Sequence, residues 1–378
     1  MSARASIPFA RSERSTVGLE WEVALVDADS GDLRQAADTI FERVGHEHPN
    51  ITQELLRNTV EVSSNKCRTV AEAGRDLQRA LDEVAAAAEP LRIELMGGGT
   101  HPFANWATQK VSDKQRYATL IDRTQWWGRQ MLIYGVHVHV GIEDRAKVLP
   151  IARAMLTVFA HIQSLSASSP FWNGRDTGYA SNRALLFQQL PTAGLPYQFE
   201  DWAQLEAYVG DMLHTGVIDQ FDEVRWDIRP APRFGTLEMR IADGATNLLE
   251  LTAISALTHC FVEHFSTLLD RGEALPTMPP WFVQENKWRS ARYGMDAIVI
   301  TDAAGDEELV TDSVAGWLTE LAPVAERLGC ADELEQVRVI LRRGASYQRQ
   351  RAVARRNAGE LDAVVGTLVA EMKAGRPL

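Results

Sequence analysis

The amino-acid sequence predicts an α+β protein in which helices cover one face of a curved, mainly antiparallel β-sheet. Several short segments alternate apolar and charged residues, as strands with one buried face do. Longer segments carry apolar residues at spacings of three, four and seven, which is typical of amphipathic helices. The gaps between the two kinds of segment are long and uneven. They do not form the regular βαβα series that a parallel sheet requires.

Size and composition predict a globular protein with a single domain over residues 1–378. Hydrophobic residues make up 45% of the 378 residues, and no repeat, low-complexity tract or Gly/Ser linker divides the chain. The net charge of −12 argues against a nucleic-acid or membrane partner, because phosphates are bound by clustered Lys and Arg. Cys67, Cys260 and Cys330 are too few and too scattered for a disulfide framework or a structural zinc site. We therefore expect a cytoplasmic protein.

Strands are predicted at residues 17–26, 59–63, 91–96, 135–142 and 235–242. In GLEWEVALVD (18–27), Leu19, Trp21 and Val23 share one face and Glu20 and Glu22 share the other. The segments TVEVS, GVHVHVG and GTLEMRIAD divide in the same way into an aliphatic face and a charged face. The charged faces of these four strands carry Glu20, Glu22, Glu61, His137, His139, Glu238 and Arg240.

These charged faces predict a metal site. Any one of them could belong to an ordinary half-buried strand, but solvated faces usually include lysine, and this set has none. In one sheet the carboxylates would repel each other unless cations bind between them, and carboxylates with one or two histidines suit Mg²⁺ or Mn²⁺. Glu54 is either a further ligand or a solvated charge. His139 is favoured as a ligand over His137, whose ring could instead stack or hydrogen bond.

Arginines near the last strand predict an anionic ligand. WDIRPAPRFGTLEMR contains Arg229, Arg233 and Arg240, and acid-rich Mg²⁺ sites without thiolates commonly hold polyphosphates. Arg240 projects onto the face of Glu238, where it could stabilise a transferred phosphoryl group or only pair with a glutamate. The run GGGTHPF (97–103) lacks the lysine of a Walker loop and is predicted to be a tight turn. His101 would approach substrate or cap this turn.

Helices are predicted at residues 70–92, 113–133, 148–166, 201–214, 247–270, 313–328 and 332–357. The most apolar segment, 248–269, is interrupted by polar residues and is predicted to be a core helix, and no window has the roughly 18 apolar residues of a membrane span.

Two further segments are candidates for ligand contact. GRDTGYASNRALLF (174–187) could close over the site with Arg183 near substrate or nucleotide, or be a surface loop with Ser181 as a helix cap. The tail ILRRGASYQRQRAVARR is predicted to be a solvated helix face. A nucleotide or subunit contact through Arg349 or Arg351 is the alternative.

Eight segments taken in order resemble the ATP-dependent carboxylate-amine ligases related to glutamate-cysteine ligase type 2. They span almost the whole chain: STVGLEWEVALVD, ELLRNTVEVSSN, LMGGGTHPF, YGVHVHVGI, ASNRALLF, WDIRPAPRFGTLEMRIAD, RYGMDAIVITD and ASYQRQR. The resemblance implies a glutamine-synthetase-like catalytic domain whose curved antiparallel sheet binds two or three Mg²⁺ or Mn²⁺ ions. It also implies that ATP activates a carboxylate, typically the γ-carboxyl of glutamate, as an acyl phosphate. An amine such as cysteine then attacks, giving an amide, ADP and phosphate.

The resemblance also implies roles for individual residues. It places metal ligands at Glu20, Glu22, Glu54, Glu61, His139 and Glu238. It makes Arg240 and Glu61 the expected catalytic residues, and Arg183, Arg229 and Arg240 the expected ATP contacts. The family usually has a shorter acidic residue where this chain has Glu54, and NTVEV is less leucine-rich than its usual counterpart, so the number of ions stays open. The implied partners are ATP, an amino acid and an amine, with a homo-oligomer left open.

The sequence has features of other protein classes besides this ligase. HVHVGIE has the cupin spacing with His137, His139 and Glu143, but no second cupin motif follows and the chain is too helical for a jelly roll. Amidohydrolases also use paired histidines, but they need a (β/α)₈ pattern that is absent here. A metal-dependent amide hydrolase, or a nucleotide-binding protein without turnover, would keep the same fold. An ATP-dependence assay separates these last two from a ligase.

Overall fold

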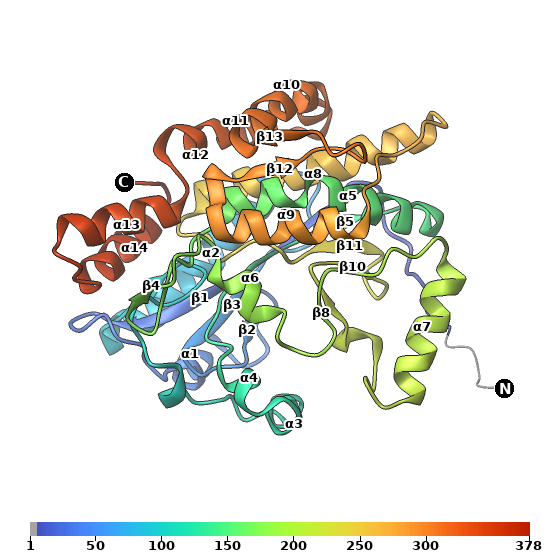
Figure 1. The fold of residues 1–378 in the computed structure, drawn as a ribbon. Helices are drawn as coiled ribbons and strands as arrows, with labels where there is room; N and C mark the ends of the chain where they lie inside the picture. Colours follow the sequence, from blue (N-terminus) through green and yellow to red (C-terminus); the bar gives the residue numbers. More distant parts are fainter. Residues whose placement is uncertain (1–5) are drawn as a thin grey trace.

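The computed structural model of the protein describes residues 6–378 and is built around a seven-stranded sheet (Figure 1). The strand order is β10-β11-β5-β1-β3-β2, and β4 pairs with the end of β1. Every neighbouring pair is antiparallel, which confirms the predicted antiparallel sheet, and the sheet is open. The strands are β1 (Val17–Asp27), β2 (Ile51–Gln53), β3 (Thr59–Ser63), β4 (Ile93–Met96), β5 (Val136–Gly141), β10 (Ile228–Ala231) and β11 (Thr236–Met239).

The long strand β1 organises the sheet. Its first half pairs with β5, its middle with β3 and its last four residues with β4. Leu19, Trp21 and Val23 are buried in the main hydrophobic core, and the Trp21 indole N–H donates to the carbonyl of Ala245 at 3.2 Å. The alternation that the sequence showed therefore orients the aliphatic face of β1 inward.

Three long helices cover the aliphatic face of the sheet: α2 (Val70–Ala88), α5 (Arg145–Ser166) and α8 (Leu248–Asp270). Each starts at a polar cap, which satisfies free N–H groups of the first turn. Thr69 and Glu72 form a capping box on α2, Asp144 caps α5 and Asn247 caps α8. In Figure 1 α5 and α8 lie above the sheet, while α3 and α4 lie below it.

The remaining elements flank this two-layer centre. The other helices are α1 (Ala37–Val44), α3 (Gln115–Thr124), α4 (Trp126–Arg129), α6 (Asn182–Phe187), α7 (Trp202–His214), α9 (Pro280–Tyr293), α10 (Val310–Leu328), α11 (Ala331–Glu335), α12 (Val337–Arg343), α13 (Ser346–Arg356) and α14 (Asp362–Ala374). Three small two-stranded sheets are formed by β6 (Phe171–Trp172) with β7 (Arg175–Asp176), β8 (Ala193–Gly194) with β9 (Arg225–Trp226), and β12 (Ile298–Ile300) with β13 (Glu307–Leu309).

Two predicted helices are wrong in their extent. The segment 113–133 is broken at Gln125, whose φ of 46° ends α3 before the short α4 begins. The segment 332–357 consists of α11, α12 and α13, and Gly344 with a φ of 84° makes the second break. Helices α1, α9 and α14 and strands β2 and β10 were not predicted. They are short, or lack an apolar period that is visible without their tertiary partners.

The expectation that no segment is apolar enough for a membrane span is wrong for helix α5, which is long and apolar enough by length and composition. However, 89% of its most apolar stretch is buried inside the protein, where α5 contacts α8 and α9. That burial is typical of the core helix of a globular protein. The sequence had identified 248–269, not α5, as the most apolar segment, and α8 over that range is also a core helix.

Candidate active site

The register of the sheet brings the charged residues of separate strands together on one face. Glu20 of β1 lies opposite His137 of β5, and Glu22 lies opposite Glu61 of β3. All four strands keep the predicted alternation of aliphatic and charged faces, so these side chains lie on the side of the sheet away from α5 and α8. We call this set the charged face, and it consists of Glu20, Glu22, Glu61, His137, His139, Glu238 and Arg240.

One end of the charged face is purely acidic. Ligand oxygens of Glu22, Glu54 and Glu61 lie within 4.8 Å of one another. The hydroxyl of Thr52 donates to Glu61 at 2.7 Å and the N–H of Gly135 donates to Glu22 at 2.5 Å. Burial and the neighbouring Glu54 raise the pKa of Glu22 to about 7, and burial with three nearby carboxylates raises the pKa of Glu61 well above its usual value. The sequence had left Glu54 open, and the fold brings it to the site.

The middle of the charged face joins carboxylates to histidines. His137 Nδ1 lies 2.8 Å from Glu20, and His139 Nε2 lies 3.4 Å from the other oxygen of Glu20. The hydroxyl of Thr236 lies 2.9 Å from His139 Nδ1 and orients this ring. Burial opposes ionisation of Glu20, but hydrogen bonds from both histidines hold its pKa well below the usual value. Burial and the charge of Arg240 lower the pKa of His137 to about 4, so its ring is neutral and free to coordinate.

The other end of the charged face is an ion-pair cluster around Glu238. Its carboxylate is completely buried and accepts hydrogen bonds from Arg229 Nε at 2.6 Å and from Arg240. Burial opposes ionisation, but these two guanidinium groups hold the pKa of Glu238 far below its usual value. Arg240 pairs with a glutamate, as one interpretation of the sequence expected, and it also lines the cavity described next. Its role toward a transferred phosphoryl group stays a prediction.

A cavity of about 510 Å³, within the range of small-molecule sites, is lined by Glu22, His137 and Arg240 of the charged face and by Glu54. Glu20, Glu61, His139 and Glu238 are not among its lining residues. Arg183 and Arg240 both line it, and the Nε atoms of both are buried without a hydrogen-bond partner among residues 6–378. The ring of Phe187 lies 5.6 Å from one guanidinium and 5.9 Å from the other. Buried N–H groups without partners are rare, so this wall is suited to an anionic ligand.

The donor atoms fit divalent metal ions. Three groups have ligand atoms within 4.8 Å of one another: Glu20, Glu61 and His137; Glu20, His139 and Glu238; and Glu22, Glu54 and Glu61. Carboxylate oxygens with neutral imidazole suit Mg²⁺ or Mn²⁺, and a cation would relieve the repulsion that raises the pKa values of Glu22 and Glu61. His137 and His139 each belong to one group, so the preference for His139 as the ligand stays a prediction.

The structure bears on two further expectations, the ATP contact of Arg229 and the role of the segment 174–187. Arg229 is not part of the cavity lining, and its guanidinium is also bound to the carbonyls of Asp222 and Val224, so its contact with ATP stays a prediction. In the second half of 174–187, Ser181 caps α6 and Arg183 is buried in the cavity. The cap predicted at Ser181 is confirmed, while closure of the segment and contact of Arg183 with substrate or nucleotide stay predictions.

The cavity also has lining residues that the strand pattern did not reveal. Arg116, Tyr117 and Arg123 of α3 line its outer part, together with Arg225 of β9. Burial and the neighbouring Arg240 lower the pKa of Arg225 to about 10. The seven-residue spacing of Arg116 and Arg123 was the available signal, because it places both on one side of a helix. Nothing in the sequence connected that helix to the charged face.

The loop GGGTHPF is structural, as predicted. His101 is buried, its Nδ1 accepts hydrogen bonds from the N–H groups of Phe103 and Ala104, and its Nε2 lies 2.9 Å from the carbonyl of Gly31. Burial lowers the pKa of His101 to about 4, so the ring is neutral. His101 therefore caps the loop, and it is not among the cavity-lining residues.

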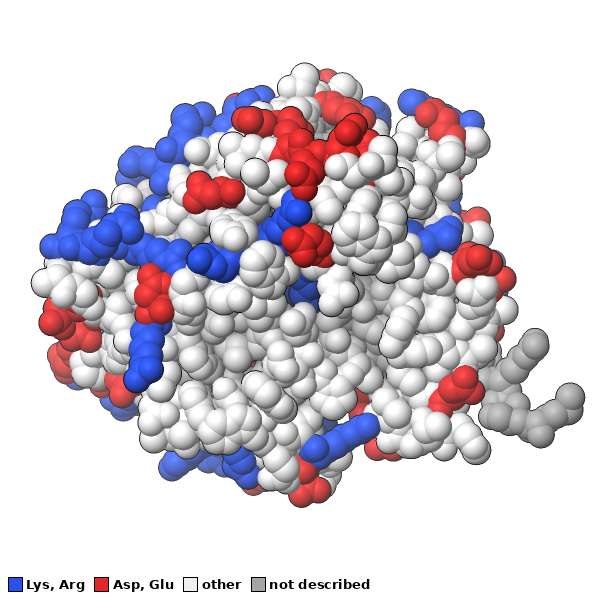
Figure 2. All heavy atoms as spheres, in the orientation of Figure 1, with Lys and Arg blue, Asp and Glu red and all other residues white. Residues whose placement is uncertain are grey.

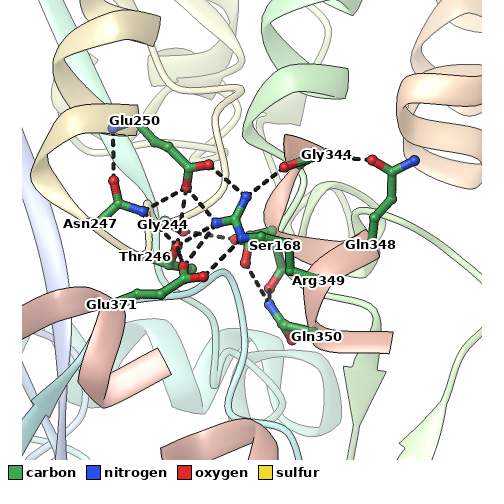
Figure 3. A network of polar contacts seen from close by, with 12 residues as sticks. Ser168, Gly244, Thr246, Asn247, Glu250, Gly344, Gln348, Arg349, Gln350 and Glu371 are labelled. Carbon is green, nitrogen blue, oxygen red and sulfur yellow. Dashed lines mark hydrogen bonds and ion pairs between the residues drawn. The ribbon is translucent and has the colours of Figure 1, made fainter. Parts of the chain in front are cut away.

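The arginine-rich tail is only partly the solvated face that the sequence predicted. Arg342, Arg343, Arg355 and Arg356 are exposed, and Figure 2 shows basic side chains gathered over the C-terminal helices at the left. Arg349 is instead inside the protein, where it pairs with Glu250 at 2.7 Å and with Glu371 at 2.9 Å (Figure 3).

Arg351 also departs from the solvated face, because it pairs with Asp176 at 2.7 Å. Neither Arg349 nor Arg351 lines the cavity over the charged face, so a nucleotide or subunit contact through them would lie elsewhere and stays a prediction. Arg349 was misjudged because its carboxylate partners are distant in sequence.

Comparison with known proteins identifies the family. The sequence model described as "Glutamate-cysteine ligase family 2(GCS2)" matches residues 16–367. The chain belongs to this family. A "Putative glutamate--cysteine ligase 2-3" from Nocardioides sp. is 59% identical over 98% of this chain and 99% of the relative. A "Putative glutamate--cysteine ligase 2" from Mycolicibacterium paratuberculosis is 58% identical over 98% of each chain. The protein is therefore an enzyme of the ligase class.

Solved structures confirm the fold of this ligase. Glutamate-cysteine ligase from Francisella tularensis, in complex with AMP, aligns with a TM-score of 0.64 at 13% identity over 97% of this chain and 94% of that one. The complex of the ubiquitin-like protein Pup with its ligase PafA aligns with a TM-score of 0.53 at 12% identity, over 94% of this chain and 71% of that one. The cupin interpretation is wrong, because the sheet is open and Glu143 pairs with Lys147 at 2.5 Å.

Proposed function

We propose that this ligase uses ATP to activate the γ-carboxyl of glutamate as an acyl phosphate, and that an amine such as cysteine attacks it. The observation that carries the proposal is the pairing of an acidic, metal-suited face with two buried arginines that have unpartnered N–H groups, in one cavity. Family membership supports ATP-dependent carboxylate-amine ligation in general. The names of the relatives suggest glutamate and cysteine as the two substrates.

The charged face would hold Mg²⁺ or Mn²⁺. The residues available for this are Glu20, Glu22, Glu54, Glu61, His137, His139 and Glu238. When bound, the ions would neutralise the charge of the ATP phosphates. Glu61 belongs to two of the three ligand groups, which makes it the best-connected carboxylate of the site together with Glu20. We therefore give Glu61 the central role in fixing the relative positions of the ions.

Arg240 and Arg183 would contact the transferred phosphoryl group. Arg240 is held by Glu238, which fixes its orientation before ligand binds, and preorganised charge is the main source of transition-state stabilisation in phosphoryl transfer. Arg183 donates to the backbone carbonyl of Arg240 at 3.2 Å, and both guanidinium groups lie against the ring of Phe187. Both guanidinium groups belong to cavity-lining residues and would donate to an incoming phosphate oxygen or acyl oxygen.

Apolar side chains in the cavity would protect the acyl phosphate from water. Phe187, Met131, Leu120 and Leu190 line the cavity among the charged groups. An acyl phosphate hydrolyses readily, so water has to be excluded until the amine arrives. The aromatic ring of Phe187 also packs against both arginines, which holds their charges at the cavity wall.

The direct test is the substrate dependence of ADP release. Purified protein with Mg²⁺ and ATP should release ADP rapidly only when glutamate and an amine are both present, with a panel of amines that includes cysteine. Glu20→Ala should abolish this activity while the far-UV circular dichroism is kept, and Glu42→Ala on the exposed side of α1 is the matched control. Cleavage of a γ-glutamyl amide without ATP would instead make the protein a hydrolase and refute the proposal.

A further inference from the structure

The carboxylate of Asp243 is completely buried at a point where three sequence motifs meet. It accepts hydrogen bonds from the N–H of Ser168 at 2.9 Å, the hydroxyl of Ser169 at 2.7 Å and the hydroxyl of Ser181 at 2.7 Å. A side chain at Gly99 would come within 2.8 Å of this carboxylate, which explains why the glycine run of GGGTHPF is needed here. Asp243 is not part of the cavity lining and is absent from the charged face.

Both serine hydroxyls that donate to Asp243 also accept a hydrogen bond from the start of α6. The N–H of Arg183 donates to Ser169 at 3.0 Å, and the N–H of Ala184 donates to Ser181 at 3.3 Å. Because the carboxylate accepts both hydroxyl protons, it turns the serine lone pairs toward these two backbone N–H groups. The carboxylate thus fixes the first turn of α6 from which Arg183 projects.

The position of Arg183 is tightly constrained at its other end as well. Its guanidinium lies so close to Gly135 that any side chain there would come within 2.2 Å of it, and the N–H of Gly135 is the donor to Glu22. Asp243 forms no ion pair with Arg183 in the described part of the chain, although the charge of Asp243 partly offsets the lowering of the Arg183 pKa by burial. Its hydrogen-bonded effect on the position of Arg183 passes through Ser169 and Ser181. A small rotation of α6 would move the guanidinium away from the cavity wall.

We infer that Asp243 is a positioning residue for ligation, acting through Ser169 and Ser181 to hold Arg183 in the cavity. This rests on the proposed function only for the role given to Arg183. Asparagine at position 243 would present a donor on one side, so one of the two serine hydroxyls would lose its acceptor and release the first turn of α6. Misplacement of a positioned group by about 1 Å can reduce the rate by on the order of 100-fold.

A double-mutant cycle tests this inference. Asp243→Asn and Arg183→Ala should each lower kcat/KM for ligation by about 10- to 100-fold, and the double variant should be no slower than Arg183→Ala within about threefold. The control is Glu371→Gln, which changes an equally buried carboxylate in the tail network. When Glu371→Gln is combined with Arg183→Ala, the two reductions in kcat/KM should multiply, because the two residues act independently. Multiplication of the Asp243→Asn and Arg183→Ala effects, or an unchanged rate in Asp243→Asn, would overturn the inference.

Two further measurements keep the test decisive. Ser169→Ala removes the same link and replaces Asp243→Asn if that variant does not fold. The ¹⁵N resonance of the Arg183 Nε–H group, assigned by its loss in Arg183→Ala, should shift in Ser169→Ala or Asp243→Asn and stay in place in Glu371→Gln. An unmoved resonance contradicts the positioning role. This readout needs no substrate, so absence of ligation with glutamate and any amine would refute the proposed function separately.

Discussion

The substitution Glu61→Gln should stabilise the metal-free protein and at the same time remove its response to Mg²⁺. Glu61 lies in the acidic end of the charged face, where burial and three neighbouring carboxylates raise its pKa well above the usual value. Glutamine has the same shape but no charge, and its carbonyl oxygen can still accept the 2.7 Å hydrogen bond from Thr52. The repulsion is therefore lost while the packing is kept.

The size of the gain follows from the distances. Two unit charges 4.8 Å apart, the outer limit of the Glu22, Glu54 and Glu61 group, repel by about 3 kcal/mol at an effective dielectric constant of about 20. Partial protonation and solvent reduce this repulsion, so we expect the free energy of unfolding to rise by roughly 1–3 kcal/mol in EDTA. In contrast, Mg²⁺ at about 100 times its Kd should raise the free energy of unfolding of the wild type by about 2.7 kcal/mol. The variant should lose most of this increase.

Urea unfolding in EDTA and in MgCl₂ measures both effects in the same protein. Glu42→Gln on the exposed side of α1 is the control for loss of one negative charge. It should change neither the free energy of unfolding in EDTA nor the increase in MgCl₂ by more than about 0.5 kcal/mol. A Glu61→Gln protein that is less stable than the wild type in EDTA, or that keeps the full Mg²⁺ response, would refute the account of the acidic end.

Other predictions concern residues outside the charged face. His101 has a pKa of about 4 in the folded protein and is neutral there. In the unfolded chain a histidine takes up a proton below about pH 6.5, so lowering the pH from 6.5 to 4 favours the unfolded state. The free energy of unfolding should fall by up to about 3 kcal/mol over this range. His101→Gln should be less stable at pH 7 and show a flatter stability curve between pH 6.5 and 4 in thermal unfolding. Arg349→Met leaves Glu250 and Glu371 buried without their cation and should cost roughly 3–5 kcal/mol. KM values should not change, and adding Glu371→Gln should recover part of the stability.

The charged face could be predicted from the sequence because alternation along a strand is a local property. Once Glu20, Glu61 and Glu238 were placed on charged strand faces, only pairing within one sheet was needed to bring them together. Glu54 was ambiguous because it follows β2 and is outside any alternating segment. The eight motifs in order resolved the family, which no single strand could do.

The rest of the cavity depends on contacts between distant segments. Arg116 and Arg123 line it from α3, and the end of α3 at Gln125, a residue with a positive φ angle, is not visible in the apolar pattern. Arg349 was assigned to solvent because its partners lie 99 and 22 residues away. The sequence indicated no role for Asp243, because its hydrogen-bond donors Ser169 and Ser181 are distant from it along the chain and meet it only after folding.

The most direct test of the central claim follows oxygen atoms from the carboxylate to phosphate. The ligase is incubated with Mg²⁺, ATP, an accepted amine and glutamate carrying ¹⁸O in its γ-carboxyl group, and the released phosphate is analysed by mass spectrometry. Activation as an acyl phosphate predicts one ¹⁸O atom in each phosphate formed with the amide product. Amide formation with unlabelled phosphate, or ADP release that does not depend on glutamate, would contradict the account.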